Sequence, residues 1–299
     1  NIVLSPRSLF RVRRVLERER FDLLHLHEPM TPAICVSCLS VATTPIVATH
    51  HASGELGWMK LGMKLWGFLL SRIDERIAVS EQARDSIARW FPGEYEVVPN
   101  GVLIPDHAAP GERDHVVVFA GRHEPRKGLH VLLGAWPEIR RRTGARLRVA
   151  GADPLAVRLL LTRLHVPDDG IEILGFLSQD ELTRELSQAK ALVAPSLGGE
   201  SFGMVLTRAF ACATPVVASD IPGYREVVTD ETAVVVPPDD RQALVAGVAG
   251  LLADEPRREA MGAAARALAN AHYAWPDLAR RLEAIYERAL GPERRRVAA

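Results

Sequence analysis

Cysteine is scarce in this chain, which has three cysteines among 299 residues. Three are too few for a disulfide scaffold, so the sequence excludes the small cross-linked secreted domains. Cys35 and Cys38 are spaced like half of a zinc or redox site, but no second cysteine pair or suitable histidine pair completes it. We therefore expect two small apolar residues one helical turn apart, in a protein of the reducing cytoplasm.

A net charge and long apolar runs are absent as well. Thirty-seven basic residues balance 37 acidic ones, so nothing in the overall charge indicates a nucleic-acid partner. No apolar run reaches the roughly 20 residues of a membrane-spanning helix. The apolar share of 47% and the charged share of 25% are usual for a globular protein. At roughly 150 residues per domain, the length predicts two domains.

Short apolar runs alternate with amphipathic segments along most of the chain. Strands that are apolar throughout and alternate with helices are typical of βαβ units, in which helices cover both faces of a parallel sheet. The fold class is therefore α/β, with two Rossmann-like parallel-sheet domains whose strand ends face a shared cleft. The expected strands are 22–27, 45–50, 76–80, 96–100, 115–121, 146–151, 171–175, 191–196, 215–220 and 233–238.

The boundary between the two domains is expected at residues 104–114, which are rich in proline, glycine and charge. The first domain would then cover residues 1–108 and the second 114–272. The tail, 273–299, is expected to form a separate amphipathic helix that begins near Pro276, because proline suits a first helical turn.

The stretch LGGESFG, residues 197–203, lies between an expected strand and a helix covering 201–213. A glycine-rich loop that leads into a helix is typical of an anion site, because the first backbone N–H groups of the helix lack partners. Ser201 is expected to cap this helix. The N–H groups expected to face a phosphate belong to Phe202, Gly203, Met204 and Val205.

Glu200 stands in the same loop and needs a different role, since a carboxylate does not hold a phosphate. It can accept hydrogen bonds from several hydroxyls, as on a sugar. A phosphate site beside a hydroxyl acceptor favours a nucleotide-sugar pocket. The alternative is a glutamate that merely caps an ordinary strand-to-helix loop.

The stretch GRHEPRKG, residues 121–128, follows another expected strand. Its spacing approaches a P-loop, but Arg126 replaces the second glycine and Gly128 replaces the serine or threonine, so we reject that interpretation. Arg122 and Lys127 remain as two cations that could clamp a diphosphate without a metal. A solvated basic turn is the alternative.

Histidines follow two strands of the first domain. His25, His27 and Glu28 resemble metal ligands, but neighbouring strand residues face opposite ways, so we expect no metal site. His51 is better placed to contact a ligand from the other domain. The alternative is a histidine with a purely structural role.

The segment 5–22 is expected to form a basic amphipathic helix. Residues 1–20 contain six arginines and two glutamates, with Leu9 and Phe10 among the apolar residues. Such helices bind anionic membrane surfaces, and Arg11, Arg13 and Arg14 are the expected contacts. A solvated helix packed on a sheet is the alternative.

Taken together, these motifs resemble those of the family-4 glycosyltransferases of the GT-B fold. Among these the chain is most similar to the actinobacterial phosphatidylinositol mannosyltransferases, in which a basic helix stands at the matching place. The similarity covers nearly the whole chain. The motifs that carry it include HLHEP, IVATHHAS, RIAVS, VVPNGV, GRHEPRKG, GGESFG, TPVVASD and VVPPDD.

The resemblance implies a retaining, metal-independent transfer of a sugar from a nucleotide diphosphate sugar, without a cofactor. GDP-mannose is the favoured donor and UDP-sugars are next, and a phosphatidylinositol-type lipid is the favoured acceptor. Glu200 would hold the donor sugar, His51 would contact it at the reaction centre, and Gly175 and Phe176 would flank the base. The last helix would return to the first domain. The protein would work in the cytoplasm, peripherally on the inner face of the plasma membrane.

The sequence departs from the family at two places. The family usually has a second glutamate eight residues after the first, where it binds ribose hydroxyls, but this chain has Arg208. Arg208 could instead pair with Glu200 or face a phosphate. The chain also begins at Asn1, after the family's first strand and glycine-rich loop, so we expect an incomplete first domain. These departures keep open a degenerate nucleotide-binding or scaffold protein. A nucleotide-sugar epimerase would need an added acid/base pair, which we do not find.

Overall fold

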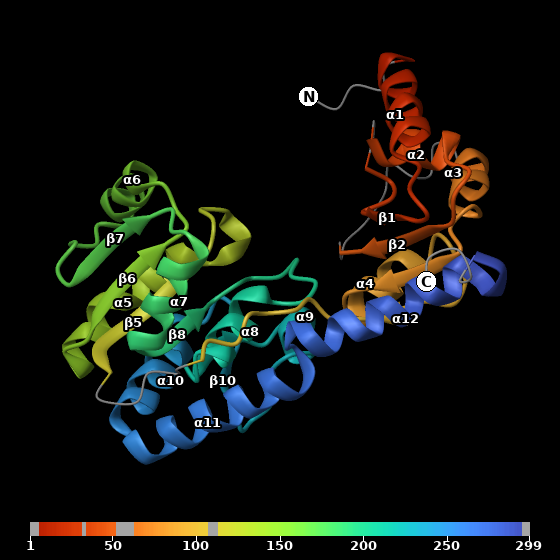
Figure 1. Cartoon of the computed structure of the whole chain (residues 1–299). Helices are drawn as coiled ribbons and strands as arrows, with labels where there is room; N and C mark the ends of the chain where they lie inside the picture. Colours follow the sequence, from red (N-terminus) through yellow and green to blue (C-terminus); the bar gives the residue numbers. More distant parts are fainter. Residues whose placement is uncertain (1–5, 32–33, 52–62, 107–112, 295–299) are drawn as a thin grey trace. The chain divides into compact units, whose positions relative to one another are not determined.

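The computed structural model describes residues 6–31, 34–51, 63–106 and 113–294 (Figure 1). The chain divides into two compact units. Unit 1 comprises residues 1–99 and 276–299, and unit 2 comprises residues 100–275. The units therefore separate between Pro99 and Asn100, ahead of the expected linker, of which residues 107–112 lie outside the described residues. Each unit contains a parallel sheet with helices, so the predicted α/β class is confirmed.

Unit 1 is built on a sheet of four parallel strands in the order β1-β2-β3-β4. These strands are β1 (Leu24–His27), β2 (Ile46–His50), β3 (Glu75–Ala78) and β4 (Glu96–Val97). His27 pairs in register with Thr49, so β1 and β2 end side by side. The residues that follow them, Glu28 and His51, therefore lie at the same edge of the sheet.

The helices of unit 1 provide two separate apolar clusters. They are α1 (Pro6–Glu19), α2 (Ile34–Val41), α3 (Met63–Leu70), α4 (Glu81–Ala88) and α12 (Trp275–Arg294). One cluster joins Leu39 of α2, Leu69 of α3 and Ile87 of α4 to the sheet. The other packs Leu278 and Ile285 of α12 against one apolar residue each of β2 and β3. Figure 1 draws α12 in blue, and ion pairs join this helix to β3 and β4.

Unit 2 is built on six parallel strands in the order β10-β9-β8-β5-β6-β7. The strands are β5 (Asp114–Ala120), β6 (Arg146–Ala150), β7 (Ile171–Gly175), β8 (Ala189–Ala194), β9 (Val216–Ser219) and β10 (Ala233–Val236). The chain proceeds outward from β5 in one direction and then from β8 in the other. Ligands of open parallel sheets bind at the carboxyl ends of the strands beside such a reversal.

Helices pack on the sheet of unit 2 around a large core that includes the fully buried Trp136. They are η2 (Pro125–Lys127), α5 (Leu129–Thr143), α6 (Pro154–Leu164), α7 (Gln179–Gln188), α8 (Met204–Ala211), α9 (Pro222–Arg225), α10 (Arg241–Ala253) and α11 (Glu255–His272). Gly128 and Gly144, both with a positive φ, flank α5. Their backbone conformations define where this helix begins and ends.

Two features of unit 1 bear on the sequence predictions. The basic helix α1 covers Pro6–Glu19, within the segment 5–22 in which it was expected. Cys35 and Cys38 both lie in α2 as free thiols, which agrees with their interpretation as small apolar residues. Among the described residues, no helix combines the length and the apolar character needed to cross a membrane.

Candidate functional site

A cavity of about 500 Å³ in unit 2 opens at the switch point of its sheet. Its walls include Gly121 after β5, Gly151 after β6 and the loop that leads from β8 into α8. Most of the residues predicted to bind the donor line this cavity. They are Arg122, Lys127, Phe176, Ser201, Phe202, Gly203, Met204 and Val205, together with Glu200, the predicted contact of the donor sugar. Arg208, whose role the sequence left open, lines the cavity as well.

The amino end of α8 forms one wall of the cavity. The helix begins at Met204 with Gly203 as its cap, and no side chain caps it. The prediction that Ser201 caps the helix is therefore wrong, because the loop continues past it and turns at Gly203 with φ 80°. Within the described part of the chain, no group accepts a hydrogen bond from the backbone N–H of residues 202–205. These amides are free to bind an anion.

Glu200 belongs to the loop between β8 and α8 and is almost buried, with 9% of its surface exposed. Arg126 donates to its Oε1 at 2.8 Å, and Lys127 Nζ lies 2.8 Å from Oε1 and 3.0 Å from Oε2. Ser196 donates to Oε1 at 3.3 Å and shares a 2.8 Å hydrogen bond with Tyr224. Burial and then the charge of Glu200 raise the pKa of Tyr224, so its hydroxyl stays protonated. These contacts hold the carboxylate in one orientation.

Arg126 connects the two loops of the site, and it was not among the predicted binding residues. Its backbone carbonyl accepts from Leu197 N–H at 2.7 Å, and its guanidinium donates to the carbonyl of Gly199 at 3.0 Å. Glu124 lies between the arginines, 2.8 Å from Arg126 and 3.0 Å from Arg122. The signal in the sequence was its position next to Lys127 in a short basic turn. Arg126 therefore positions Glu200 rather than lining the cavity itself.

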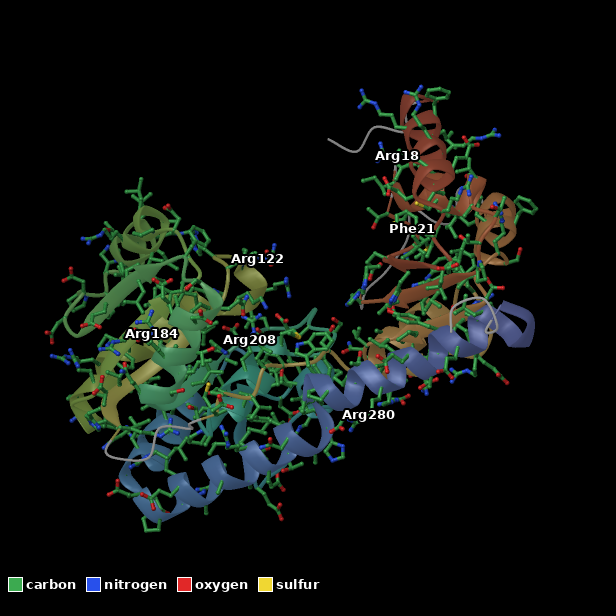
Figure 2. The ribbon with its side chains drawn as sticks, viewed as in Figure 1. Arg18, Phe21, Arg122, Arg184, Arg208 and Arg280 are labelled. Carbon is green, nitrogen blue, oxygen red and sulfur yellow. The ribbon has the colours of Figure 1, made fainter. Side chains whose placement is uncertain are left out.

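Arg208 lies on α8, one turn after its first residue, and lines the cavity (Figure 2). It is partly buried, and burial lowers the pKa of its guanidinium. No carboxylate pairs with it among the residues that the structure describes. Of the two alternatives left open by the sequence, pairing with Glu200 is not observed, since Glu200 pairs with Arg126 and Lys127.

Phe176 and Leu177 line the side of the cavity that follows β7. The ring of Phe176 is 74% exposed, which leaves it free to contact a ligand. Gly175 adopts φ 69°, and its carbonyl accepts from the N–H of Gly151 at 2.7 Å, so it shapes the turn without lining the cavity. Asn100 also lines the cavity, and sequence reasoning missed it as a site residue, although it belongs to the VVPNGV motif.

The predicted site residue His51 lies in unit 1, beside a cluster of histidines at the ends of β1 and β2. His27 Nδ1 and His51 Nε2 form a hydrogen bond of 2.8 Å. The His25 ring stacks on His27, with 4.4 Å between the ring centroids, and bonds to Tyr286 and Thr49 at 2.7 Å each. Burial, followed by the charge of His27, lowers the pKa of His51. His51 is therefore neutral at pH 7 and can both donate and accept hydrogen bonds.

The described residues contain no group of three or more His, Cys, Asp or Glu side chains placed to hold a metal ion. In particular, His25 already has hydrogen-bond partners on both ring nitrogens.

The buried histidines predict that unit 1 loses stability in acid. Burial lowers the pKa of His25 and His50 to about 4, against about 6.5 in an unfolded chain. Above pH 6.5 both states are neutral, and below it only the unfolded state gains protons. We expect the free energy of unfolding of unit 1 to fall as pH drops from about 6.5 to about 4, by on the order of 2 kcal/mol for the buried His50.

This loss would be measured by urea unfolding of the full chain at several pH values, with hydrogen exchange of the unit 1 amides as the probe of unfolding. His50→Gln should flatten the pH dependence, whereas His123→Gln, at an exposed histidine of unit 2, should leave it unchanged. An unchanged pH dependence in His50→Gln would contradict the prediction.

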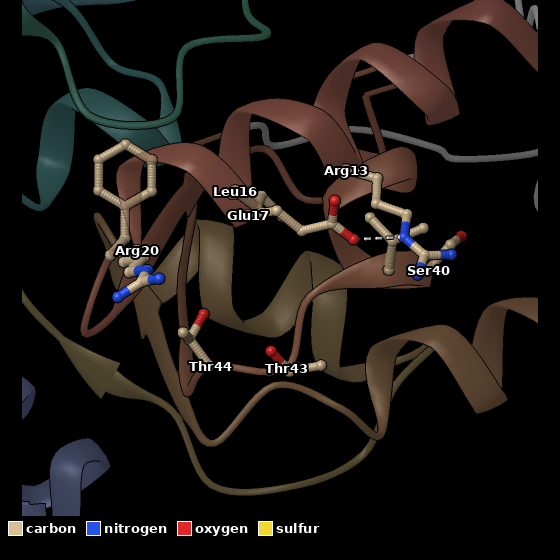
Figure 3. Close-up of a pocket in the computed structure, with 9 residues that line it drawn as sticks. Arg13, Leu16, Glu17, Arg20, Ser40, Thr43 and Thr44 are labelled. Atoms are coloured by element: carbon tan, nitrogen blue, oxygen red, sulfur yellow. Dashed lines mark hydrogen bonds and ion pairs between the residues drawn. The ribbon is translucent and has the colours of Figure 1, made fainter.

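A second cavity, of about 610 Å³, lies in unit 1 between α1 and the segment that joins α2 to β2 (Figure 3). Its lining includes Arg13, Arg20, Ser40 and Thr44. Arg13 is already paired with Glu17 at 2.7 Å. Thr44 precedes β2, so the cavity lies at the amino edge of the sheet, away from the strand ends where ligands of such sheets bind.

Sequence comparison finds two family models along the chain. The model of "Glycosyltransferase Family 4" matches residues 1–103, and that of "Glycosyl transferases group 1" matches residues 104–268. A phosphatidyl-myo-inositol mannosyltransferase of Mycobacterium leprae is 36% identical over 95% of this chain and 78% of its own length. One of Propionibacterium freudenreichii is 34% identical over 75% of this chain. The chain spans 59% of the length of that relative.

Structural comparison finds the same fold in solved glycosyltransferases. Sucrose-phosphate synthase from Thermosynechococcus elongatus superimposes with a TM-score of 0.78 at 23% identity, covering 94% of this chain and 77% of the other. HepE from Anabaena, solved in complex with UDP and glucose, gives a TM-score of 0.75 at 18% identity, covering 95% and 83%. With both family models matched and the fold shared, this chain belongs to the family-4, group-1 glycosyltransferases of the GT-B fold, a family of transferase enzymes.

Proposed function

We propose that the protein transfers a sugar, with retention of anomeric configuration and without a metal, from a nucleotide diphosphate sugar to a hydroxyl group of a lipid. The observation that carries the proposal is the buried Glu200 beside Lys127 and the free amides of α8, all in one cavity. The amides offer sites for phosphate oxygens, and the carboxylate offers an acceptor for sugar hydroxyls. Transfer needs both in contact with the same substrate.

Arg122 and Lys127 would stabilise the diphosphate as it leaves. Arg122 is 71% exposed and can swing toward a ligand, whereas Lys127 is 19% exposed and held by Glu200. Two cations and the dipole of α8 supply the positive charge that a divalent metal supplies in other enzymes. Phe176, with Gly175 shaping its turn, would flank the base.

The donor and acceptor are proposed from the relatives. The similar proteins of Mycobacterium leprae and Propionibacterium freudenreichii are named phosphatidyl-myo-inositol mannosyltransferases, which favours GDP-mannose and a phosphatidylinositol-type acceptor. The UDP in the HepE structure makes UDP-sugars the second choice. His51, neutral and held by His27, would contact the sugar at the reaction centre. The protein would work in the cytoplasm at the inner face of the plasma membrane.

The test is donor turnover with and without acceptor. The full chain would be incubated with GDP-mannose or UDP-glucose, with and without phosphatidylinositol vesicles, and with EDTA in parallel. A lipid-linked α-anomer formed only with acceptor, and formed equally in EDTA, would support the proposal. Change of the donor sugar without acceptor would indicate an epimerase. Nucleotide binding with neither reaction would indicate a degenerate scaffold protein and overturn the proposed transfer.

Membrane binding through α1 gives a separate prediction. Arg11, Arg13 and Arg14 are exposed on this helix, and Phe10, whose ring lies under the Arg14 guanidinium, is 65% exposed. Replacing the three arginines by glutamine should lower binding to phosphatidylinositol-containing vesicles more than tenfold, because each basic residue near an anionic surface contributes about 1 kcal/mol.

Co-sedimentation with anionic and with neutral vesicles measures the effect. The matched control replaces three exposed arginines of unit 2, namely Arg141, Arg142 and Arg184. Equal losses in the two triple variants, or equal binding of the native chain to neutral vesicles, would count against α1 as the membrane contact.

A further inference from the structure

The three cations that line the cavity of unit 2 differ in their partners. Arg122 pairs with Glu124 and Lys127 pairs with Glu200. Arg208 is partly buried and has no carboxylate partner in the part of the chain that the structure describes. A partly buried charge without a partner has lost solvation that nothing in the protein replaces. An anionic group of a ligand would supply the missing partner.

The position of Arg208 on α8 indicates which anionic group this is. Long side chains on a helix point back toward its amino end and cover the preceding turn. The preceding turn is that of Met204 and Val205, whose N–H groups are among those without an acceptor. The guanidinium and the free amides therefore serve the same region of the cavity. In the proposed function this region holds the diphosphate.

The acceptors that line the cavity indicate how strongly it can select for a ribose. Among its described lining residues, Glu200 is the one carboxylate, and the proposed function assigns the acceptor sites that Arg126 and Lys127 leave open to hydroxyls of the transferred sugar. A ribose presents two hydroxyls, and a carboxylate reserved for them would give the strongest selection, because a charged acceptor binds a hydroxyl more tightly than a neutral group does. Arg208 offers donors only. A ligand that lacks the 2′-hydroxyl therefore leaves no second carboxylate unpaired in the described lining.

We propose that Arg208 is a specificity-determining residue. It binds the phosphates of the donor and does not select for the hydroxyls of the donor's ribose. The cavity then accepts 2′-deoxyribonucleoside diphosphate sugars as readily as their ribose counterparts. This inference rests on the proposed function, because it takes the cavity to be the site of a nucleotide diphosphate sugar. It adds a class of donor, the deoxyribonucleotide sugars, to those that the relatives indicate.

Calorimetric titration of the full chain tests the inference without any need for turnover. The probes are UDP and GDP, each compared with its 2′-deoxy form. We expect the dissociation constants within each pair to agree within about threefold, since the described lining has no second carboxylate to bind the 2′-hydroxyl. Arg208→Gln should weaken all four by about tenfold through the lost charge-assisted contact. Arg208→Glu should weaken all four further and create a preference for ribose of about tenfold.

The outcomes separate this inference from the proposed function. Binding of UDP or GDP with a tenfold or larger preference for ribose in the native chain would overturn the inference and leave the proposed function standing. No binding of any of the four nucleotides would overturn both. The matched control is Arg184→Gln, which replaces an exposed arginine of α7 outside the cavity and should leave the four affinities unchanged. Equal weakening by Arg184→Gln would assign the Arg208 effect to general charge, again against the inference.

Discussion

Glu200→Gln is expected to lower sugar transfer about 100- to 1000-fold, the effect of removing one preorganised charged group from a reaction centre. Glutamine keeps the shape of the side chain but replaces one carboxylate oxygen by an NH2 group, which cannot accept hydrogen bonds. It also lacks the charge that holds Lys127 at 2.8 Å. Binding of GDP or UDP should persist or tighten, because Lys127 is then free of its competing carboxylate. The predicted signature is loss of transfer with retained nucleotide binding.

The measurement compares the affinity for GDP with that for GDP-mannose, together with the rate of transfer. In the variant, GDP-mannose should bind no more tightly than GDP, whereas the affinity for GDP itself should remain. Glu138→Gln is a suitable control, because Glu138 also bridges two cations, Arg141 and Arg142, but on the exposed side of α5. Equal losses of GDP binding and transfer in Glu200→Gln would show that Glu200 is only structural.

The sheets of both units were predictable because their central strands, such as β2 and β9, are buried on both faces. All ten apolar runs proved to be strands, for example 115–121, which forms β5 at Asp114–Ala120. Such runs stand out in a sequence because the parallel sheet needs apolar residues at every position. The start of α8 was less predictable. Ser201 and Gly203 are both residues that begin helices, and the choice of Gly203 depends on its close packing against Tyr224, 21 residues later.

The ion pairs around Glu200 could not be read from the sequence. Arg126 and Glu200 are 74 residues apart in the sequence. They meet because their loops follow two neighbouring strands, β5 and β8. The sequence predicted that both loops border a ligand site, because each follows the carboxyl end of an expected parallel strand. It did not indicate whether Arg126, Lys127 or Arg208 would meet the carboxylate, because that depends on side-chain packing.

Gly128→Ala should destabilise unit 2 by more than about 2 kcal/mol and weaken nucleotide binding with it. Gly128 adopts φ 68°, where a β-carbon costs about 1 kcal/mol. An added β-carbon would also lie 1.8 Å from the backbone carbonyl oxygen of Pro195, so the two loops must separate. Lys127 precedes Gly128 and Ser196 follows Pro195, and both of these neighbours contact Glu200. Separation therefore disturbs the carboxylate as well as the fold.

Gly144→Ala provides the matched control at the other end of α5. Gly144 has nearly the same conformation, φ 71°, but an added β-carbon there meets nothing within 4 Å. Its cost should be about 1 kcal/mol, from the backbone conformation alone, with no change in nucleotide affinity. Urea unfolding and GDP titration of both variants separate the contributions. If the two substitutions cost the same, the close approach of Gly128 to Pro195 contributes nothing to stability. If Gly128→Ala binds GDP normally despite the larger cost, the loop contact stabilises unit 2 without shaping the cavity.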